Sequence, residues 1–329
     1  MRVCDAGGWT DTWFAGHGVV CSLAVRPGAH VRATPGGDAP VSLVVGATGE
    51  RYGFDPSVPG PGRHPLLEAV VAAAPPPTPY ELSIGASVPP GSGTGTSAAV
   101  VVALVAALRA LRHETIDAHD LATRAHAIET GLGWQSGVQD QHAAAHGGVL
   151  LIEVDYPRAT VHSLDVAATT RAELDRRLLT VWLGHPHRSS LLHEQVIAKL
   201  TPRDAPVALE PLRRAARAAA DALAHDDLDA YGAALIENTE QQAALDERLV
   251  GPDARAGIDV ARSHGAVGWK VNGAGGSGGT LSVIGPADPA RHDLLARALG
   301  AIEQWTILDL RLSEQGLQLD QSAGRSTSS

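Results

Sequence analysis

Residues 89–111 read PPGSGTGTSAAVVVALVAALRAL, so three glycines among small hydroxyl residues run directly into a long apolar segment. Glycine adopts backbone conformations closed to other residues and lets a ligand approach the main chain closely. The free N–H groups at the start of a helix carry partial positive charge and attract anions. The segment therefore predicts a loop that wraps phosphate, followed by a helix over about 97–112.

The helix expected over 97–112 is apolar on nearly every face, so it should lie centrally, covered on several sides. Its apolar run ends at Leu108 and is shorter than the ~20 residues that span a bilayer, so no membrane partner is expected. Apolar spacing also predicts a helix over 117–130 and two amphipathic helices within 205–247. Strands are expected over 19–25, 41–45, 80–88, 147–155 and 178–184, and a strand, glycine loop and strand over 268–285.

The composition indicates a globular, intracellular protein. The 329 residues are 44% hydrophobic and 19% charged, which is enough for two domains with sizeable cores. A net charge of −10 argues against a nucleic-acid partner, which would require a clustered basic face. Cys4 and Cys21 make no disulfide framework, and no basic-then-apolar leader opens the chain, so a cytoplasmic location is expected.

Two familiar phosphate loops fit residues 91–98 poorly. A Walker A loop ends in Gly-Lys-Ser/Thr, and this loop has no lysine. Gly93, Gly95 and Ala98 fit the dinucleotide pattern G-x-G-x-x-A, but Pro89 and Pro90 interrupt the strand that should run into it. A second G-x-G-x-x-G begins at residue 273, but a strand-like segment follows it instead of a helix. A nicotinamide-dependent oxidoreductase is therefore disfavoured.

Three segments together resemble the motifs of a known kinase family. PPGSGTGTSAA (89–99) is similar to the phosphate-binding motif P-x-G-x-G-L-G-S-S-A-A of the GHMP kinases, which include galactokinase, homoserine kinase, mevalonate kinase and phosphomevalonate kinase. RVCDAGGWTDTWFAGHGVV (2–20) resembles the first motif of the family, and GWKVNGAGGSGG (268–279) resembles the third. Because the three occur in order along the whole chain, the sequence is identified as a member of this family.

The resemblance implies an α+β fold of two lobes with the active site between them. Its domains would be an N-terminal ATP-binding domain over 1–160 and a C-terminal domain over 161–320, followed by a flexible tail over 321–329. The cofactors would be ATP and Mg²⁺. The nucleotide phosphates would be held by Pro90, Gly91, Ser92, Gly93, Thr94, Gly95, Thr96, Ser97 and Ala98.

The stretch AIETGLGWQSGVQDQHAAAHGG (127–148) supplies the carboxylates that phosphoryl transfer needs. Glu129 lies near the end of the helix expected over 117–130, and Asp140 lies in the loop expected to follow. By the resemblance, Glu129 and the Ser97 hydroxyl would bind Mg²⁺, and Asp140 and Arg2 would be catalytic. Asp140 would face the acceptor hydroxyl, either as a base or to orient it, whereas a solvated helix face is the plain alternative for Glu129.

The acceptor is expected to be a sugar. Three stretches of sequence resemble the fucokinase and heptose 7-phosphate kinase branch. They are GGWTD (7–11), GWQ with the later DQ (133–141) and WLGHPHRSS (182–190). This implies phosphorylation of a sugar or sugar-phosphate hydroxyl, the anomeric one. The residues expected to contact the substrate are Gly8, Trp9, Thr10, Asp11, Arg188, Gly275 and Gly276, with Arg188 open to the plainer reading of a surface arginine.

Other functions stay open at this point. The chain could be a GHMP kinase that acts on a non-sugar alcohol such as homoserine or mevalonate, or a sensor that binds sugar and ATP without catalysis. Glu129 and Asp140 together argue against the sensor, which needs neither. His142 and His146 stand four residues apart and could share a metal, but no third ligand is evident, so packing is favoured. The oligomeric state is left open.

Overall fold

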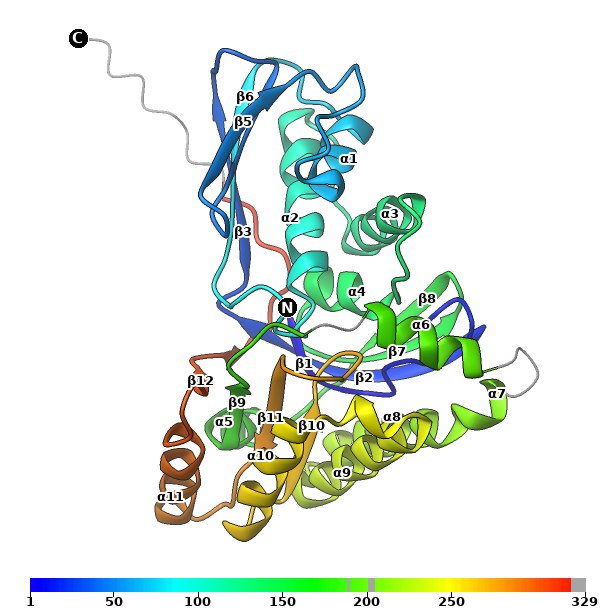
Figure 1. The fold of residues 1–329 in the computed structure, drawn as a ribbon, viewed down its shortest axis with the longest axis vertical. Coiled ribbons are helices and arrows are strands. Elements are labelled where there is room, and N and C mark those ends of the chain that lie inside the picture. Colours follow the sequence, from blue (N-terminus) through cyan, green and yellow to red (C-terminus); the bar gives the residue numbers. More distant parts are fainter. Residues whose placement is uncertain (188–189, 201–204, 321–329) are drawn as a thin grey trace.

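The computed structural model describes residues 1–187, 190–200 and 205–320. Helices and three β-sheets are arranged along the long axis of the molecule (Figure 1). One sheet crosses the middle, one stands above it with helices on one side, and one lies below it beside further helices. The fold is therefore of the mixed helix-and-sheet class that the sequence predicts.

The central sheet has the strand order β1–β2–β7–β8, and β13 pairs with β2. All of its pairings are antiparallel. Helices lie on both of its faces (Figure 1), so β1 is buried throughout, although antiparallel sheets often expose one face. The strands are β1 Arg2–Ala6, β2 His17–Arg26, β7 Val149–Asp155, β8 Arg158–Ser163 and β13 Arg311–Leu312.

The upper sheet has the order β3–β6–β4–β5 and packs against α2 and α1. Its strands are β3 Ala29–Pro35, β4 Val41–Val45, β5 Glu50–Phe54 and β6 Tyr80–Ala86. The helices beside it are α1 Pro65–Ala73, α2 Thr96–Leu111, α3 Ala118–Gly131 and α4 Gln139–His146. Val101, Leu104, Val105 and Leu108 of α2 are all buried, which confirms the expected central position of this helix.

The lower sheet has the order β10–β11–β9–β12, built from β9 Leu178–Trp182, β10 Gly268–Val271, β11 Thr280–Ile284 and β12 Thr306–Leu308. The helices of this half are α5 Ala168–Arg177, α6 Ser190–Lys199, α7 Ala205–Ala208, α8 Glu210–Ala224, α9 Leu228–Leu245, α10 Pro252–Ser263 and α11 Pro289–Gly300, with a short 3₁₀ turn, η1, at Glu247–Leu249. No helix in the described part of the chain is long and apolar enough to cross a membrane.

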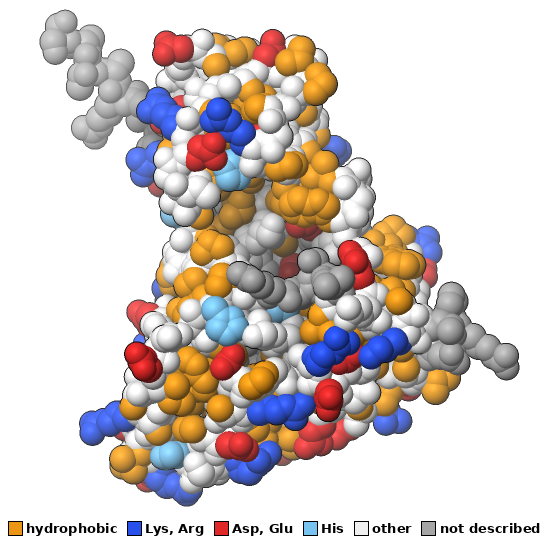
Figure 2. Space-filling model, viewed as in Figure 1, with side chains coloured by type: hydrophobic (Ala, Val, Ile, Leu, Met, Phe, Trp, Pro, Cys, Tyr) orange, Lys and Arg blue, Asp and Glu red, His pale blue; other side chains and the backbone are white. Residues whose placement is uncertain are grey.

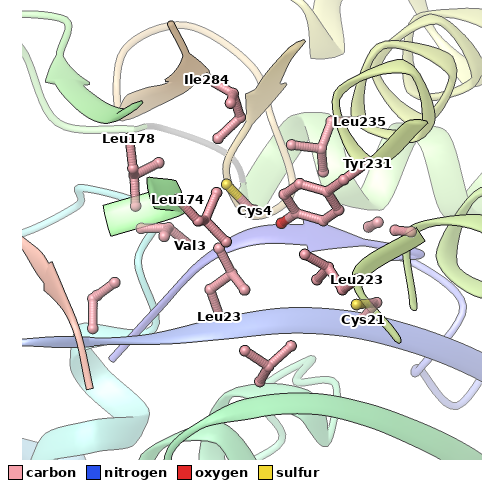
Figure 3. Packing of buried hydrophobic residues seen from close by; sticks show 14 of the residues in the cluster. Val3, Cys4, Cys21, Leu23, Leu174, Leu178, Leu223, Tyr231, Leu235 and Ile284 are labelled. Carbon is pink, nitrogen blue, oxygen red and sulfur yellow. The ribbon is translucent and has the colours of Figure 1, made fainter. Parts of the chain in front are cut away.

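The core beneath the central sheet joins segments far apart in sequence (Figure 3). One buried cluster contains Val3 and Leu23 of the sheet together with Tyr231 and Leu235 of α9. Ile284 of β11 belongs to the same cluster, so the central sheet, α9 and the lower sheet share one core. This packing fixes β1, and with it Arg2 and Asp5, against the C-terminal half of the chain.

The strands expected over 19–25, 41–45, 80–88, 147–155 and 178–184 are confirmed, as are both strands of 268–285 and the helices over 97–112, 117–130 and 205–247. One expectation is wrong. Asp140 does not lie in a loop but in the first turn of α4. The segment is short and polar at its start, and tertiary contacts stabilise it, so its helical character is weak in the sequence alone.

Candidate active site

The glycine loop begins at Gly91 and ends at the start of α2. Gly91, Gly93 and Gly95 have φ angles of 74°, 73° and 68°, in the left-handed region that glycine occupies without strain. Gly95 is the residue directly before α2. The three glycines therefore allow the tight path by which this loop reaches the N-terminus of the helix.

Other segments hold the carbonyl groups of the glycine loop. The oxygens of residues 91–94 accept hydrogen bonds from the His187 backbone N–H, from the Thr280 hydroxyl, and from the Arg2 guanidinium and backbone N–H. By contrast, the backbone N–H groups of residues 91–98 donate to no other residue within the described chain. A loop whose carbonyls are engaged and whose N–H groups are free has the arrangement that an anion requires.

The hydroxyl groups of the loop have two different environments. Those of Ser92, Thr94 and Thr96 bond to one another, with oxygens 3.1 Å apart in the Ser92–Thr94 and Thr94–Thr96 pairs. Ser92 and Thr94 are buried, so their hydroxyls shape the loop. Ser97, the second residue of α2, is exposed, and its hydroxyl is open to a ligand.

Arg2 lies between the glycine loop and Asp140. It is 3% exposed, its Nε donates to Asp140 Oδ1 at 2.7 Å, and another of its nitrogens donates to the Gly93 carbonyl oxygen. Burial alone would lower the pKa of Arg2, but the charges of Asp140 and Asp5 outweigh it and hold this pKa above its ordinary value. The guanidinium therefore stays charged and fixes the Asp140 carboxylate beside the loop.

Asp11 is buried beneath the start of α4. Its Oδ2 accepts a hydrogen bond at 3.0 Å from the backbone N–H of Gln139, the first residue of that helix. Burial raises the pKa of Asp11 to about 6, and the nearby charge of Asp140 adds to this rise. Asp11 thus caps the helix that carries Asp140 and feels the charge of that carboxylate.

Glu129 lies in the last turn of α3, close to the same group of carboxylates. It is buried, and it accepts hydrogen bonds from the Ser136 hydroxyl at 3.0 Å and from the Gln141 side-chain amide. Burial and the charge of Asp140 raise the pKa of Glu129, and the bonds from Ser136 and Gln141 oppose this rise. A cation beside Glu129 and Asp140 would relieve their repulsion, and carboxylate and hydroxyl oxygens are hard donors that suit Mg²⁺. The residues at this point therefore fit a magnesium ion.

Comparison with known proteins identifies this architecture. Residues 65–148, which include the glycine loop, α2, Glu129 and Asp140, match the family described as GHMP kinases N terminal domain. The chain carries a GHMP kinase N-terminal domain. The family resemblance predicted from the sequence is thereby confirmed, and the matched residues contain the second of the three motifs.

Two curated relatives of the chain are sugar kinases by name. D-glycero-alpha-D-manno-heptose 7-phosphate kinase from Campylobacter jejuni is 25% identical over 74% of the chain and 71% of that protein. The bifunctional fucokinase/GDP-fucose pyrophosphorylase from Arabidopsis thaliana is 25% identical over 63% of the chain but only 20% of that protein. Among solved structures, a D-glycero-D-manno-heptose 1-phosphate kinase from Bacteroides thetaiotaomicron has a TM-score of 0.76 at 19% identity, covering 98% of both chains.

The segment 2–20, which resembles the first motif of the family, folds under the third glycine loop. The Trp9 indole N–H donates to the Ala274 carbonyl at 3.1 Å, and the Trp9 ring packs edge-on against His193. The Thr10 hydroxyl bonds to backbone oxygens of Gly7 and Val19 and is fully buried, so it orders its own loop. Of the expected acceptor contacts here, Thr10 is committed to the backbone, and Trp9 is 4% exposed and packed within a hydrophobic cluster.

The third glycine loop uses its glycines for close packing. Gly275 and Gly276 are buried, and the Gly276 N–H donates to the Leu249 carbonyl at 2.7 Å. A Cβ at Gly275 would collide with the same carbonyl oxygen. The backbone N–H of Gly273 donates to both oxygens of Asp5 at 3.1 Å. The loop is thus tied to β1, and Gly8 likewise lies against Asp5.

Two residues of the site, Asp5 and Gln141, are absent from the sequence predictions. Asp5 is fully buried and binds Gly273, and Gln141 bonds to Glu129. His187 lies against Gly276, and burial together with the charges of His193 and Arg2 lowers its pKa to about 4. The DQ pair at 140–141 was a usable signal for Gln141, but no spacing rule marks Asp5. Arg188, an expected substrate contact, lies outside the described residues.

Proposed function

We propose that this chain is an ATP-dependent kinase that transfers phosphate to the anomeric hydroxyl of a sugar or sugar phosphate. The observation that carries the proposal is the glycine loop, whose N–H groups are free and whose carbonyls are held by other segments. Through Arg2 this loop is joined to Asp140, so an anion site and a carboxylate stand side by side. The heptose-kinase and fucokinase relatives support a sugar acceptor.

The nucleotide phosphates would bind along residues 90–98, above the N-terminus of α2. Backbone N–H groups and the positive end of the helix would replace the water around the phosphate oxygens. Ser97 and Glu129 would hold Mg²⁺, which supplies charge neutralisation for the phosphates when bound. Arg2 remains charged beside the loop and would offset the negative charge that builds up during transfer.

Asp140 is the residue best placed to meet the acceptor. Its side chain is 27% exposed, whereas those of Arg2 and Asp5 are buried, so it is the part of this ion-paired group that can reach a ligand. In Figure 2 the face of the molecule is hollowed near the start of α2, with acidic side chains inside the hollow. Asp140 would either accept the proton of the acceptor hydroxyl or orient that hydroxyl. The hydroxyl oxygen of the acceptor would then form a bond to the γ-phosphorus as ADP leaves.

The acceptor would lie on the side of Trp9, His187 and His193. The Trp9 ring is buried, so it would shape this side of the pocket through its contact with His193. Asp11 would position ring hydroxyls from below, and Arg188 would meet a second phosphate on a phosphorylated acceptor. We also propose that residues 1–160 and 161–320 act as the two domains, and that the reaction takes place in the cytoplasm, where buried free thiols such as Cys4 and Cys21 persist.

A panel of acceptors tests the proposed function. ADP release would be measured with free hexoses and deoxyhexoses, heptose 7-phosphate, homoserine and mevalonate at saturating ATP and Mg²⁺. The proposal predicts turnover on at least one sugar or sugar phosphate and none on homoserine or mevalonate. Phosphate appearing on homoserine or mevalonate, with every sugar inert, would exclude the sugar reading.

A further inference from the structure

Three histidines meet where α3 begins and α4 ends. His142 and His146 stand one turn apart on α4 and so share a face of that helix. His119, near the start of α3, supplies the third ring, which the sequence gives no reason to expect beside them. One ligand atom from each histidine lies within 4.8 Å of the other two.

Two of these histidines have nitrogens without a partner. His142 is 3% exposed, and its Nδ1 makes no hydrogen bond within the described chain. The Nε2 of His146 is also buried without a partner there. Buried polar atoms are nearly always satisfied, so two orphaned nitrogens in one cluster call for an explanation that packing does not provide.

We propose that His119, His142 and His146 bind a divalent transition-metal ion of the zinc class, with solvent completing the coordination. Imidazole nitrogen is a preferred ligand of Zn²⁺, and three protein ligands with one open position form a known type of zinc site. Three atoms no more than 4.8 Å apart have a common point within about 2.8 Å of each, and Zn–N bonds are about 2.1 Å. Closing the site therefore requires each ring to move by less than about 1 Å.

The charges around the cluster agree with such an ion. Burial, together with the charges of the neighbouring histidines, lowers the pKa of His142 to about 3, and burial lowers the pKa of His146 although Asp117 opposes this. A neutral imidazole is the form of histidine that binds a metal, and a lower pKa favours it. His119 is exposed and lines a cavity of about 710 Å³ between α3 and the β7–β8 hairpin, so an ion can reach the cluster from solvent.

The ion would join α3 to α4. Asp140 lies in the first turn of α4, and Glu129 lies near the end of α3. A bond between the two helices would hold these carboxylates in a fixed relation from behind the proposed active site. The metal site itself does not depend on the proposed kinase activity, because its evidence is a different set of residues.

Zinc and cobalt binding test the site directly. The untagged full chain, stripped with a chelator and free of ATP, would be titrated with Zn²⁺ by calorimetry and with Co²⁺ by visible absorption. We expect one ion per chain and a Co²⁺ spectrum typical of tetrahedral nitrogen coordination. His119→Ala changes an exposed side chain, so the fold should persist while Zn²⁺ binding weakens by about tenfold or more. His146→Ala should weaken it similarly.

His225→Ala is the matched control, because His225 is also exposed and sits at the end of α8 next to Asp221. This variant should bind Zn²⁺ as the original chain does. Circular dichroism of each variant would establish that the helices are intact. The proposal would be overturned if the original chain took up no Zn²⁺. It would also be overturned if His119→Ala and His225→Ala bound Zn²⁺ equally well.

Discussion

At the scale of single residues, the ion pair between Arg2 and Asp140 links phosphate binding to the acceptor. Held by this arginine, the Asp140 carboxylate can act on the acceptor hydroxyl in two ways, by orienting it or by removing its proton. Both roles depend on the Asp140 carboxylate, whereas ATP binding does not require it. The two functions can therefore be separated by one substitution.

Asp140→Asn should leave ATP affinity nearly unchanged and lower turnover by about 10²–10⁴-fold, the range of general acid–base effects. Steady-state kinetics and ATP binding by calorimetry would measure the two quantities separately. Asp120→Asn is the control, since Asp120 also lies in the first turn of a helix and pairs with arginines, but away from the glycine loop. Equal turnover in Asp140→Asn and the original chain would remove Asp140 from the mechanism.

Asp11 predicts a pH dependence of stability. Its pKa in the folded chain is about 6, above the ordinary 3.8, so the folded state binds more protons than the unfolded state between these values. Stability contributed by protonated Asp11 is thus present at low pH and lost as the pH rises through 6, by about 3 kcal/mol in total. Asp11→Asn does not titrate.

Urea unfolding of the original chain and of Asp11→Asn at pH 4, 5, 6 and 7 would test this. The free energy of unfolding of the variant, relative to that of the original chain, should increase by about 2.4 kcal/mol between pH 4 and pH 7. A difference that stays constant over this range would show that the pKa of Asp11 is not raised.

At the scale of elements, the junction between the glycine loop and α2 depends on the backbone of Gly95. A Cβ at this position would lie 3.1 Å from the carboxyl carbon of Asp140, and the φ of 68° is strained for any other residue. Gly49, in the turn between β4 and β5, has a φ of 70° and open space around its Cα. The two glycines therefore share the strain but differ in their neighbours.

Gly95→Ala and Gly49→Ala should each lose about 1 kcal/mol of stability through backbone strain. Only Gly95→Ala should also lose turnover, because the added methyl group pushes Asp140 away from the loop. Thermal unfolding and steady-state rates of both variants would measure this. Equal turnover in the two variants would mean that the contact between Gly95 and Asp140 has no bearing on activity.

The helices α2 and α3 bring Ser97 and Glu129 to the proposed magnesium site. Ser97→Ala combined with Glu129→Gln removes both oxygen ligands, so the Mg²⁺ concentration for half-maximal rate should rise at least about tenfold. Magnesium titrations at fixed ATP would measure this concentration. Ser57→Ala is the control, because Ser57 lies in a surface turn where its N–H pairs with Asp55. Overlapping titrations of the double variant and the original chain would contradict the assignment.

Element type was predictable where the residue pattern is strong. The apolar run after Ser97 and the β-rich run in 41–45 predicted α2 and β4, because burial and local preference agree there. The start of α4 was predicted as a loop, since Gln139 and Asp140 are polar and the helix is held by the Asp11 cap. A cap supplied from 128 residues away leaves no local signal.

At the scale of the whole molecule, the site forms where three distant segments meet. The N-terminal strand donates to Thr94 of the glycine loop, Thr280 donates to Ser92, and Gly273 donates to Asp5. The motifs predicted that these segments matter, and the family resemblance implied that they converge. Their pairwise contacts, and the meeting of His119 with α4, depend on tertiary packing that sequence spacing does not encode.

The most direct test of the central claim is ³¹P NMR of the reaction mixture. The chain would be incubated with ATP, Mg²⁺ and the acceptor that releases most ADP in the panel. We predict that the γ-phosphate signal of ATP is replaced by a sugar phosphate signal coupled to the anomeric proton, and that Asp140→Asn suppresses it. Intact ATP in the presence of every sugar, or release of the γ-phosphate only as inorganic phosphate, would contradict the claim that this chain is a sugar kinase.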